Sequence, residues 1–551
     1  MNSFRPDRSI DSFYMMLLQV CILTGCFAVV LLHLPDPLHF ISDNDWGLQL
    51  AAADQILGGE HPFIDFPIYY GPLTPYASAL AQLLLQKQPL AELLLVSTGY
   101  TLAYFLLFNL FRQISGNLII SLLMLCVSLL LMPRMYKYYI LLCPVLVMSG
   151  IFWYLKKPRL LQLFAVALTV VLTGLYRQDY GAYAFLTCSF ILVLKPLEGC
   201  DRLVSIFKFC CAVLLFTLPW LVFLVFHGSF INYLQTSIFQ APRAIMSIAL
   251  PYSMKGQDLS GIFADFPSVL FLISQSLPTV GLILLLILYR KFDDVRWVRL
   301  AALILFAQLC LIQGMHRQDY QHTLQAIPLA LVLCCWLISI ACKAFLSSSL
   351  FSKVTGGLAL LIFSGLGIYC IQYNVIESRS YRDSAEIRQL VEDYKIFAQP
   401  RQAFVDSVAR KNPNTVQIRT LRYIAECTRP GERIAAYVRL TSLYYFADRM
   451  FGGGIMSVNP GLLTQQQERE VIAKLRNQEP VLFIDNPLFN YGIGNRGVFG
   501  IYSPLLHQFL AENFITVRAW GGRTISVNRR YLATVPQRCL SGDGKKMVTS
   551  M

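Results

Sequence analysis

Charged residues are scarce in this sequence. They make up 14% of its 551 residues, whereas 56% of the residues are hydrophobic. An ordinary soluble domain has roughly 25% charged residues, and its apolar residues fill one core rather than repeated long runs. The composition therefore excludes a soluble enzyme and indicates a chain that lies in a bilayer, surrounded by membrane lipids.

A compact basic surface is also missing, although the formal net charge is +14. The Lys and Arg residues are scattered over short segments between apolar runs and over the C-terminal region, with no stripe that is interleaved with aromatic residues. Such a stripe is the usual mark of nucleic-acid binding. We therefore expect no nucleic-acid partner.

Metal-binding and dinucleotide-binding motifs are absent as well. The 15 cysteines form no C-x-x-C pair and fall mostly within apolar runs, which argues against a zinc site. Gly452-Gly453-Gly454 follows no clear strand with G-x-G-x-x-G spacing, so we expect a turn there. Cys427 and Cys539 lie in the polar C-terminal region and would pair there only if it faces an oxidising compartment and brings them together.

Long apolar runs are what the sequence has in abundance. A helix needs about 20 mostly apolar residues to cross a bilayer, and by that measure the chain has about eleven spans. A proline within a span, such as Pro144, is tolerable where neighbouring helices satisfy the backbone. We therefore predict a polytopic α-helical membrane protein. The spans are placed at 13–34, 90–111, 117–132, 137–155, 160–176, 180–194, 207–226, 268–289, 298–315, 323–342 and 354–373.

The loops between the spans alternate in charge. Lys and Arg are concentrated before the first span and then in every second loop, for example at Lys156, Lys157 and Arg159, and cytoplasmic loops carry such an excess. The N-terminus is therefore predicted to be cytoplasmic. The first long loop, residues 35–89, and the C-terminal region then lie on the non-cytoplasmic side, because the number of spans is odd.

The last part of the chain, residues 374–551, is predicted to be a soluble domain. Charged stretches with helical periodicity, such as Ser380 to Phe397 and Gln465 to Asn477, alternate with short apolar runs that are typical of strands. This alternation favours an α/β fold, whereas residues 1–373 form the membrane-spanning domain. The predicted strands are Ile434 to Val438, Val481 to Ile484, Ile515 to Ala519 and Thr524 to Val527.

The first outer loop is acidic and contains no Lys or Arg between Pro35 and Gln86. The orientation rule alone accounts for the missing basic residues, and in that interpretation the loop is merely solvated. It does not account for the aromatic, Gly and Pro residues among the acids. An amphipathic helical stretch from Asp45 to Leu57 ends at Gly58-Gly59, and a second apolar helix, Thr74 to Leu85, is too short to span and is predicted to lie at the interface.

The order of residues in this loop resembles that of a known family. Asp45, then I-L-x-G from Ile56, P-[FY]-x-D-F from Pro62 and G-P-L from Gly71, is similar to the first outer loop of GT-C superfamily glycosyltransferases. That superfamily includes the protein O-mannosyltransferases and the lipid A aminoarabinose transferases. The resemblance covers most of residues 1–373. It implies a GT-C-like fold and a transferase that moves a hexose or pentose from a polyprenyl-phosphate-linked donor to a glycan, lipid or protein acceptor on the non-cytoplasmic face.

In the family that the loop resembles, an acidic residue near its start serves as catalytic base or positions the acceptor. That residue corresponds to Asp45, with Asp43 two positions earlier as its rival. A carboxylate is needed because an acceptor hydroxyl is a weak nucleophile until its proton is removed. Asp65 is interpreted as a second carboxylate or, preferably, as a hydrogen-bond acceptor that fixes the loop, and Tyr70 as a residue that shapes it. The other acids need no role beyond solvation: they are Asp36, Asp54 and Glu60.

The same chemistry calls for basic side chains near the donor phosphate, where negative charge develops as the sugar leaves. The tetrapeptide R-Q-D-Y begins at Arg177 and again at Arg317, at the outer ends of two spans. Arg317, with His316 and His322 close by, is predicted to bind the donor phosphate, and Arg177 ranks behind them. In an alternative of equal weight, each Arg pairs with a nearby Asp to hold a helix end in place, and the histidines make interfacial hydrogen bonds.

Metal dependence and two other functions stay open at this point. Asp43 and Asp45 offer two carboxylates to Mg²⁺ or Mn²⁺, but the sequence does not identify the further oxygen ligands that either ion needs. A transporter or flippase of a lipid-linked glycan would also have many spans and outer Arg residues. Transporters often carry ionisable residues deep in the membrane, whereas here they cluster at helix ends. A non-catalytic membrane scaffold is the third interpretation.

Overall fold

The chain divides into two compact units, each assembled from separate stretches of sequence. The membrane unit comprises Met1–Leu34, Val96–Thr217 and Pro251–Ile387. The loop unit comprises Pro35–Leu95, Leu218–Leu250 and Arg388–Met551. The computed structural model describes residues 8–68, 70–131, 135–240, 242, 266–288, 294–314, 326–347, 349–371, 384–459, 462–487 and 498–540.

Within the described residues, each predicted span overlaps one helix. Six of these helices are long and apolar enough to cross a bilayer, and others contain shorter apolar stretches. The protein is therefore a multi-pass α-helical membrane protein, as predicted. The helices are α1 (Arg8–Leu32), α5 (Pro89–Ser115), α6 (Leu118–Leu130), α7 (Tyr138–Lys156), α8 (Leu160–Tyr176), α9 (Gln178–Leu194), α10 (Arg202–Phe226), α14 (Phe266–Leu288), α15 (Asp294–Gly314), α17 (Pro328–Phe345) and α18 (Leu350–Ile371).

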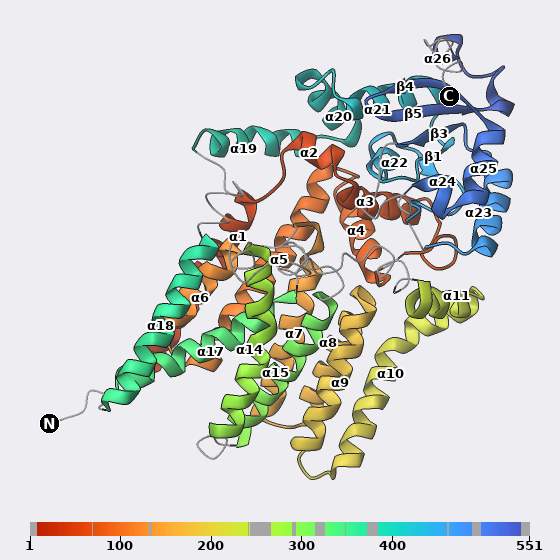
Figure 1. Ribbon diagram of the computed structural model, residues 1–551. Coiled ribbons are helices and arrows are strands. Elements are labelled where there is room, and N and C mark those ends of the chain that lie inside the picture. Colours follow the sequence, from red (N-terminus) through yellow and green to blue (C-terminus); the bar gives the residue numbers. More distant parts are fainter. Residues whose placement is uncertain are drawn as a thin grey trace. The chain divides into compact units, whose positions relative to one another are not determined.

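Helices α7, α8, α9 and α15 form the middle of the membrane unit, where they run side by side (Figure 1). In the most apolar stretch of α7, 72% of the residues are buried, whereas in that of α1 only 17% are. Helix α7 is therefore an interior helix and α1 a peripheral one. Pro144 lies inside α7, as the tolerance for proline within a bundle allows. Helix α17 starts at Pro328, later than the predicted residue 323, because proline favours the first turn of a helix.

The first outer loop is helical in the loop unit. Its elements are α2 (Pro37–Ser42), α3 (Asn44–Leu57) and α4 (Leu73–Leu84). Helix α3 ends where predicted, because Gly58 caps it and Gly59 adopts a φ of 89° that disfavours other residues. Helix α4 has 12 residues, too few to cross a bilayer. The same unit contains the short helices α11 (Phe230–Leu234) and η2 (Gln235–Gln240).

The loop unit contains a five-stranded sheet, in which the strands lie side by side in the order β2-β1-β3-β5-β4. Strand β1 pairs in parallel with β2 and β3, and β5 pairs antiparallel with β3 and β4. Gly521 and Gly522 join β4 to β5 with positive φ at both residues, as a two-residue hairpin turn requires. The strands are β1 (Arg433–Ala435), β2 (Met450–Phe451), β3 (Leu482–Asp485), β4 (Phe514–Trp520) and β5 (Arg523–Asn528).

Strand β1 is shorter than the predicted strand Ile434 to Val438. After Ala435 the backbone bonds to side chains and loops instead of a neighbouring strand. The Ala436 N–H donates to the Tyr444 hydroxyl at 2.7 Å, and the Tyr437 carbonyl accepts from Ser457 Oγ at 3.0 Å. Gly452 to Gly454 form a turn after β2, as predicted.

Helices surround this sheet, and α23 and α25 pack against each other beside β4 (Figure 1). The core includes Ala435 and Phe483 from the sheet with Leu475 and Leu506 from the two helices. The predicted α/β alternation of the C-terminal region is therefore confirmed. The helices are α19 (Ser384–Phe397), α20 (Arg401–Lys411), α21 (Val416–Cys427), α22 (Ser442–Phe446), α23 (Gln465–Gln478), α24 (Phe499–Tyr502), α25 (Pro504–Asn513) and α26 (Gln537–Leu540).

Candidate functional site

The two neighbouring acids Asp43 and Asp45 have different surroundings. Asp43 is the N-cap of α3, and its Oδ1 accepts hydrogen bonds from the backbone N–H of Asp45 at 2.6 Å and of Trp46 at 3.1 Å. Its Oδ2 lies 3.5 Å from Nε2 of His39. An N-cap satisfies backbone N–H groups that have no helical partner, so the position of Asp43 is explained by the start of the helix.

Asp45 lies in the first turn of α3 and is half-buried. Residues three, four and seven positions further along a helix share one face with it. In α3 these residues are Leu48, Gln49 and Ala52, and all three line a pocket in the loop unit. The candidate base therefore lies one helical turn from the pocket, on the helix face that borders it.

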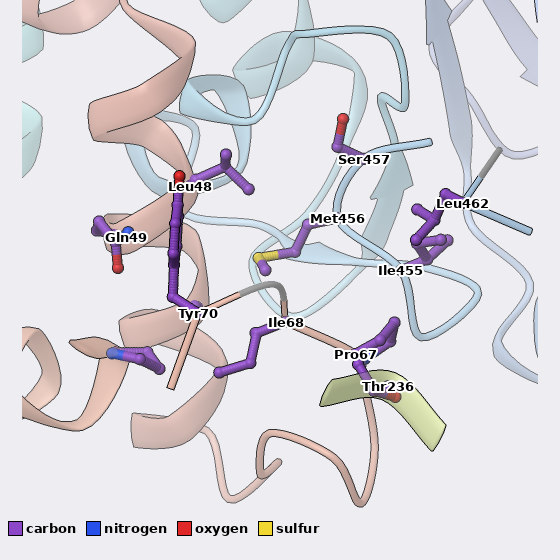
Figure 2. A pocket seen from close by; sticks show the side chains of 12 residues that line it. Leu48, Gln49, Pro67, Ile68, Tyr70, Thr236, Ile455, Met456, Ser457 and Leu462 are labelled. Atoms are coloured by element: carbon purple, nitrogen blue, oxygen red, sulfur yellow. The ribbon is translucent and has the colours of Figure 1, made fainter. Parts of the chain in front are cut away.

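The pocket lies between α3, the segment that follows it and the segment after β2 (Figure 2). The empty space in and in front of it, which includes open solvent, is about 580 Å³. Pro67, Ile68 and Tyr70 line it from the outer loop. Thr236 of η2 and the segment from Ile455 to Ser457 complete the wall.

The N-terminal end of α3 is held by residues from far along the chain. Thr441 Oγ1 lies 2.6 Å from the Asn44 carbonyl oxygen and 2.8 Å from Asn44 Oδ1, which share its single hydroxyl proton, and its backbone N–H donates to Oδ1 at 3.0 Å. Gln417 donates to the Ile41 carbonyl at 3.0 Å. Gly47 packs so closely on α22 that a methyl group there would overlap the backbone of Ser442. These contacts set the position of the turn that carries Asp45.

The acids Asp54 and Glu60 at the far end of α3 are not merely solvated, so that interpretation was wrong. Arg401 forms ion pairs with Asp54 and Asp448, and Lys87 Nζ lies 3.0 Å from Asp54 Oδ1. Arg433 pairs with Glu60. Lys87 lies near the end of the same loop, whereas Arg401 and Arg433 come from the C-terminal region of the chain.

Asp36 has a structural contact too. Its Oδ1 accepts hydrogen bonds from the backbone N–H groups of Leu38 and His39, both at 2.9 Å, and so caps α2.

Asp65 fixes the shape of the loop between α3 and α4. Its Oδ2 accepts a hydrogen bond from the His61 backbone at 2.7 Å, while its carbonyl accepts one from Lys474 Nζ at 2.8 Å. Within this turn Phe63 has a φ of 67°, a left-handed conformation that is costly for an aromatic residue. His61 Nδ1 lies 2.9 Å from the Tyr76 hydroxyl, whose pKa is raised to about 12 by burial and by the nearby Asp65.

Arg177 belongs to the membrane unit and is engaged within its own motif. Its Nε and Nη2 donate to the two carboxylate oxygens of Asp179 at 2.8 and 3.0 Å. The guanidinium also lies 4.7 Å from the ring centre of Tyr180. The side chain is 6% exposed, so the pair that the sequence offers as an alternative is present here. The second motif, with His316, Arg317 and His322, lies outside the described residues.

No group of three or more His, Cys, Asp or Glu residues that could hold a metal ion occurs in the described part of the chain. Asp43 and Asp45 alone provide too few oxygen ligands for Mg²⁺ or Mn²⁺.

Several pocket residues were missed by sequence reasoning. Gln49 could have been found from helical spacing, because it lies four positions after Asp45. Met456 and Ser457 could not, because nothing in the local sequence indicates that the segment after β2 meets a loop about 400 residues earlier.

The Cys427–Cys539 disulfide joins α21 to α26 in the loop unit. It was left open by the sequence, because only the fold brings the two cysteines together.

No protein-family model matches the chain, and no curated protein matches it. Two crystal structures of ArnT from Cupriavidus metallidurans are similar to it, one bound to undecaprenyl phosphate and one in the apo state. They share 13% sequence identity with the chain at TM-scores of 0.49 and 0.46. The similarity covers 93% and 94% of this chain and 98% of each ArnT chain, and by itself it assigns no activity and no residue role.

Proposed function

We propose that the chain is an inverting glycosyltransferase, which moves a sugar from a polyprenyl-phosphate-linked donor to a glycan, lipid or protein acceptor on the non-cytoplasmic face. The observation that supports this most is the placement of Asp45 on the face of α3 that borders a pocket. One of the two similar ArnT structures holds undecaprenyl phosphate, a carrier of the class proposed here.

In this proposal the carboxylate of Asp45 acts as the general base. It takes the proton from the acceptor hydroxyl as that oxygen attacks the anomeric carbon of the donor. The bond from the anomeric carbon to the phosphate oxygen breaks, and its electron pair leaves with the polyprenyl phosphate. Attack by one oxygen in a single displacement inverts the anomeric centre, and the proposal includes no glycosyl-enzyme nucleophile.

The leaving phosphate needs compensating positive charge. We assign this role to Arg317 with His316 and His322, and to Arg177 in second place. Arg177 ranks second because Asp179 already engages its guanidinium through two hydrogen bonds and compensates part of its charge.

The disulfide in the loop unit supports a reaction on the non-cytoplasmic side of the membrane. Disulfides persist in oxidising compartments and are rare in the cytosol. We therefore place the loop unit, with Asp45 and the Cys427–Cys539 bond, on the non-cytoplasmic side and the N-terminus in the cytoplasm.

The test is sugar transfer in a folded, membrane-inserted preparation of the full chain. Radiolabelled sugar should pass from a polyprenyl-phosphate donor to acceptor in the wild type, and Asp45→Ala should reduce the rate by about 100-fold or more. Asp36→Asn is the matched control, because it removes an acid from the same loop while Asn still caps α2. Undiminished transfer by Asp45→Ala would rule out the base assignment.

A further inference from the structure

The pocket beside Asp45 has an uncharged wall. None of the twelve described residues that line it is an acid or a base. Most are aliphatic, and the polar ones, Gln49, Tyr70, Thr236 and Ser457, carry amide or hydroxyl groups. Moving an unpaired charge from water into such surroundings is unfavourable, so the lining disfavours carboxylate, ammonium and phosphate groups.

Gln49 is the amide side chain in the wall of the pocket. It is 6% exposed, and within the described residues its side-chain amide makes no hydrogen bond. The amide atoms are not among the buried polar atoms that lack a partner, so they reach the space of the pocket, where a ligand can pair with them. The amide offers two N–H donors and a carbonyl acceptor, which together match neighbouring hydroxyl groups that both donate and accept.

The other polar groups complete a surface that suits a sugar ring. Ser457 Oγ donates to the Tyr437 carbonyl at 3.0 Å, so its lone pairs remain available to accept from a ligand hydroxyl. The Tyr70 side chain and the apolar side chains of Ile68 and Met456 line the same space (Figure 2). A saccharide ring has an apolar C–H face that packs on such groups and hydroxyls at its edge.

We propose that this pocket binds an uncharged saccharide ring, with Gln49 as the residue that recognises its hydroxyl groups. The inference rests on the proposed function, because it names the class of sugar that the same site takes. The ring belongs either to the donor or to the acceptor, and both would meet the same chemistry. Sugars that carry an amino group or a carboxylate are excluded from the pocket.

The direct test is a binding comparison with the full chain in lipid nanodiscs. The probes are polyprenyl phosphate alone and polyprenyl phosphate linked to glucose, glucosamine or glucuronic acid. Each of the two charged sugars differs from glucose in one group on the ring. If the ring belongs to the donor, we expect the glucose-linked probe to bind at least tenfold more tightly than either charged one. If it belongs to the acceptor, methyl glucoside should have the same advantage over methyl glucosaminide and methyl glucuronide in the presence of polyprenyl phosphate. A wild-type chain that shows neither preference would overturn the inference.

A second arm separates the two sources of the ring. If the pocket takes the donor sugar, glucose-linked polyprenyl phosphate binds more tightly than polyprenyl phosphate alone, and Gln49→Met removes that gain. If it takes the acceptor, methyl glucoside binds in the presence of polyprenyl phosphate, and Gln49→Met weakens that binding instead. An affinity that does not respond to Gln49→Met in either format rejects the inference.

Charge substitution gives a sharper version of the test. Gln49→Glu should weaken binding of the neutral ring at least tenfold and favour the amino sugar, whereas Gln49→Lys should favour the sugar acid. Gln465→Glu is the matched control, because it makes the same change at an exposed position in the first turn of α23, and it should leave every affinity unchanged. If the charged variants fail to fold, Gln49→Met still gives a decisive test, because the methionine side chain is uncharged and similar in size to that of glutamine.

Binding is measured without turnover, so the two proposals can fail separately. A wild-type chain that prefers the neutral ring but transfers no sugar would contradict the proposed function only. A chain that transfers sugar and prefers a charged ring would contradict this inference only.

Discussion

At the scale of single residues, two acids two positions apart make different contacts because of where α3 begins. Asp43 precedes the helix, and its carboxylate turns toward the backbone N–H groups of the first turn. Asp45 is already helical, and its position on the helix face follows from the helical period. The sequence identified both as candidates, but the choice between them depends on the first residue of a helix, which local patterns place only within a few residues.

Arg177 allows a test that separates a structural role from a phosphate-binding role. Arg177→Ala leaves Asp179 without its bidentate partner and removes the contact with the Tyr180 ring. We expect a loss of about 1–2 kcal/mol in unfolding free energy, since the pair is only partly buried and solvent compensates part of the charge left on Asp179. Thermal unfolding in detergent measures this. Unchanged stability with weaker polyprenyl-phosphate binding would show that the residue serves the ligand alone.

Asp485, at the end of β3, predicts a dependence of stability on pH. Burial raises the pKa of its carboxyl, although the Asn486 N–H and His507 act in the opposite direction. An acid whose pKa is higher in the folded state favours folding at low pH, and that contribution is lost as the pH rises through the folded pKa.

Asp485→Asn should therefore be more stable than the wild type at pH 7.5, and the difference should shrink as the pH falls toward about 4, near the unfolded pKa of Asp. The variant can still accept the Asn486 N–H bond through its amide oxygen. Unfolding midpoints at several pH values provide the measurement. A difference that stays constant with pH would contradict the assigned cause.

At the scale of elements, α3 is anchored at both ends by the C-terminal region of the chain. Thr441 holds its first residue, and Arg401 pairs with Asp54 near its last turn. Pairs of this kind join residues about 350 to 400 positions apart. The helix itself could be predicted from the sequence, because amphipathic spacing and Gly58-Gly59 are local signals, but its anchors could not.

Thr441→Val tests whether this anchoring positions the candidate base. Losing the hydroxyl hydrogen bond that the Asn44 carbonyl and Oδ1 share should cost about 1–2 kcal/mol of stability and, through the displaced first turn, roughly tenfold in kcat. Thr464→Val is the matched control. It removes the N-cap of α23, which costs about 1 kcal/mol of stability, but it leaves the contacts of Thr441 with Asn44 in place. Equal losses of kcat in both variants would mean that only general stability matters.

The elements that could be predicted share one property: the residue pattern that indicates each of them lies within a short stretch of sequence. The apolar runs of the spans and the strands Val481 to Ile484 and Thr524 to Val527 are of this kind. The order of the strands was not predictable, because β1 meets β3 through residues nearly 50 positions apart. The end of β1 was missed because it depends on the Tyr444 hydroxyl.

At the scale of the whole molecule, the chain consists of a membrane unit and a loop unit that draws on three separate stretches. The multi-pass architecture follows from composition, which is a global property of the sequence. The assembly of the pocket from the outer loop, η2 and the segment after β2 does not, because it is decided by contacts within a folded unit.

The disulfide should stabilise the loop unit. Cys427 and Cys539 are separated by 112 residues, and closing a loop of that length restricts the unfolded chain. Cys427→Ser should lower the unfolding free energy by about 2–5 kcal/mol, as should a reductant added to the wild type. Maleimide labelling of both cysteines in intact native membranes without reductant would show that the bond is absent and would remove the support for an oxidising compartment.

The central claim is that Asp45 removes the acceptor proton, and a comparison of Asp45→Asn with Asp43→Asn in a single-turnover transfer assay tests it most directly. Asn keeps the cap of α3 at position 43, so this variant should transfer sugar at close to the wild-type rate. Asp45→Asn should bind the donor normally and transfer about 100-fold more slowly or worse, because the base is gone. Normal transfer by Asp45→Asn, or an equal loss in Asp43→Asn, would contradict the account.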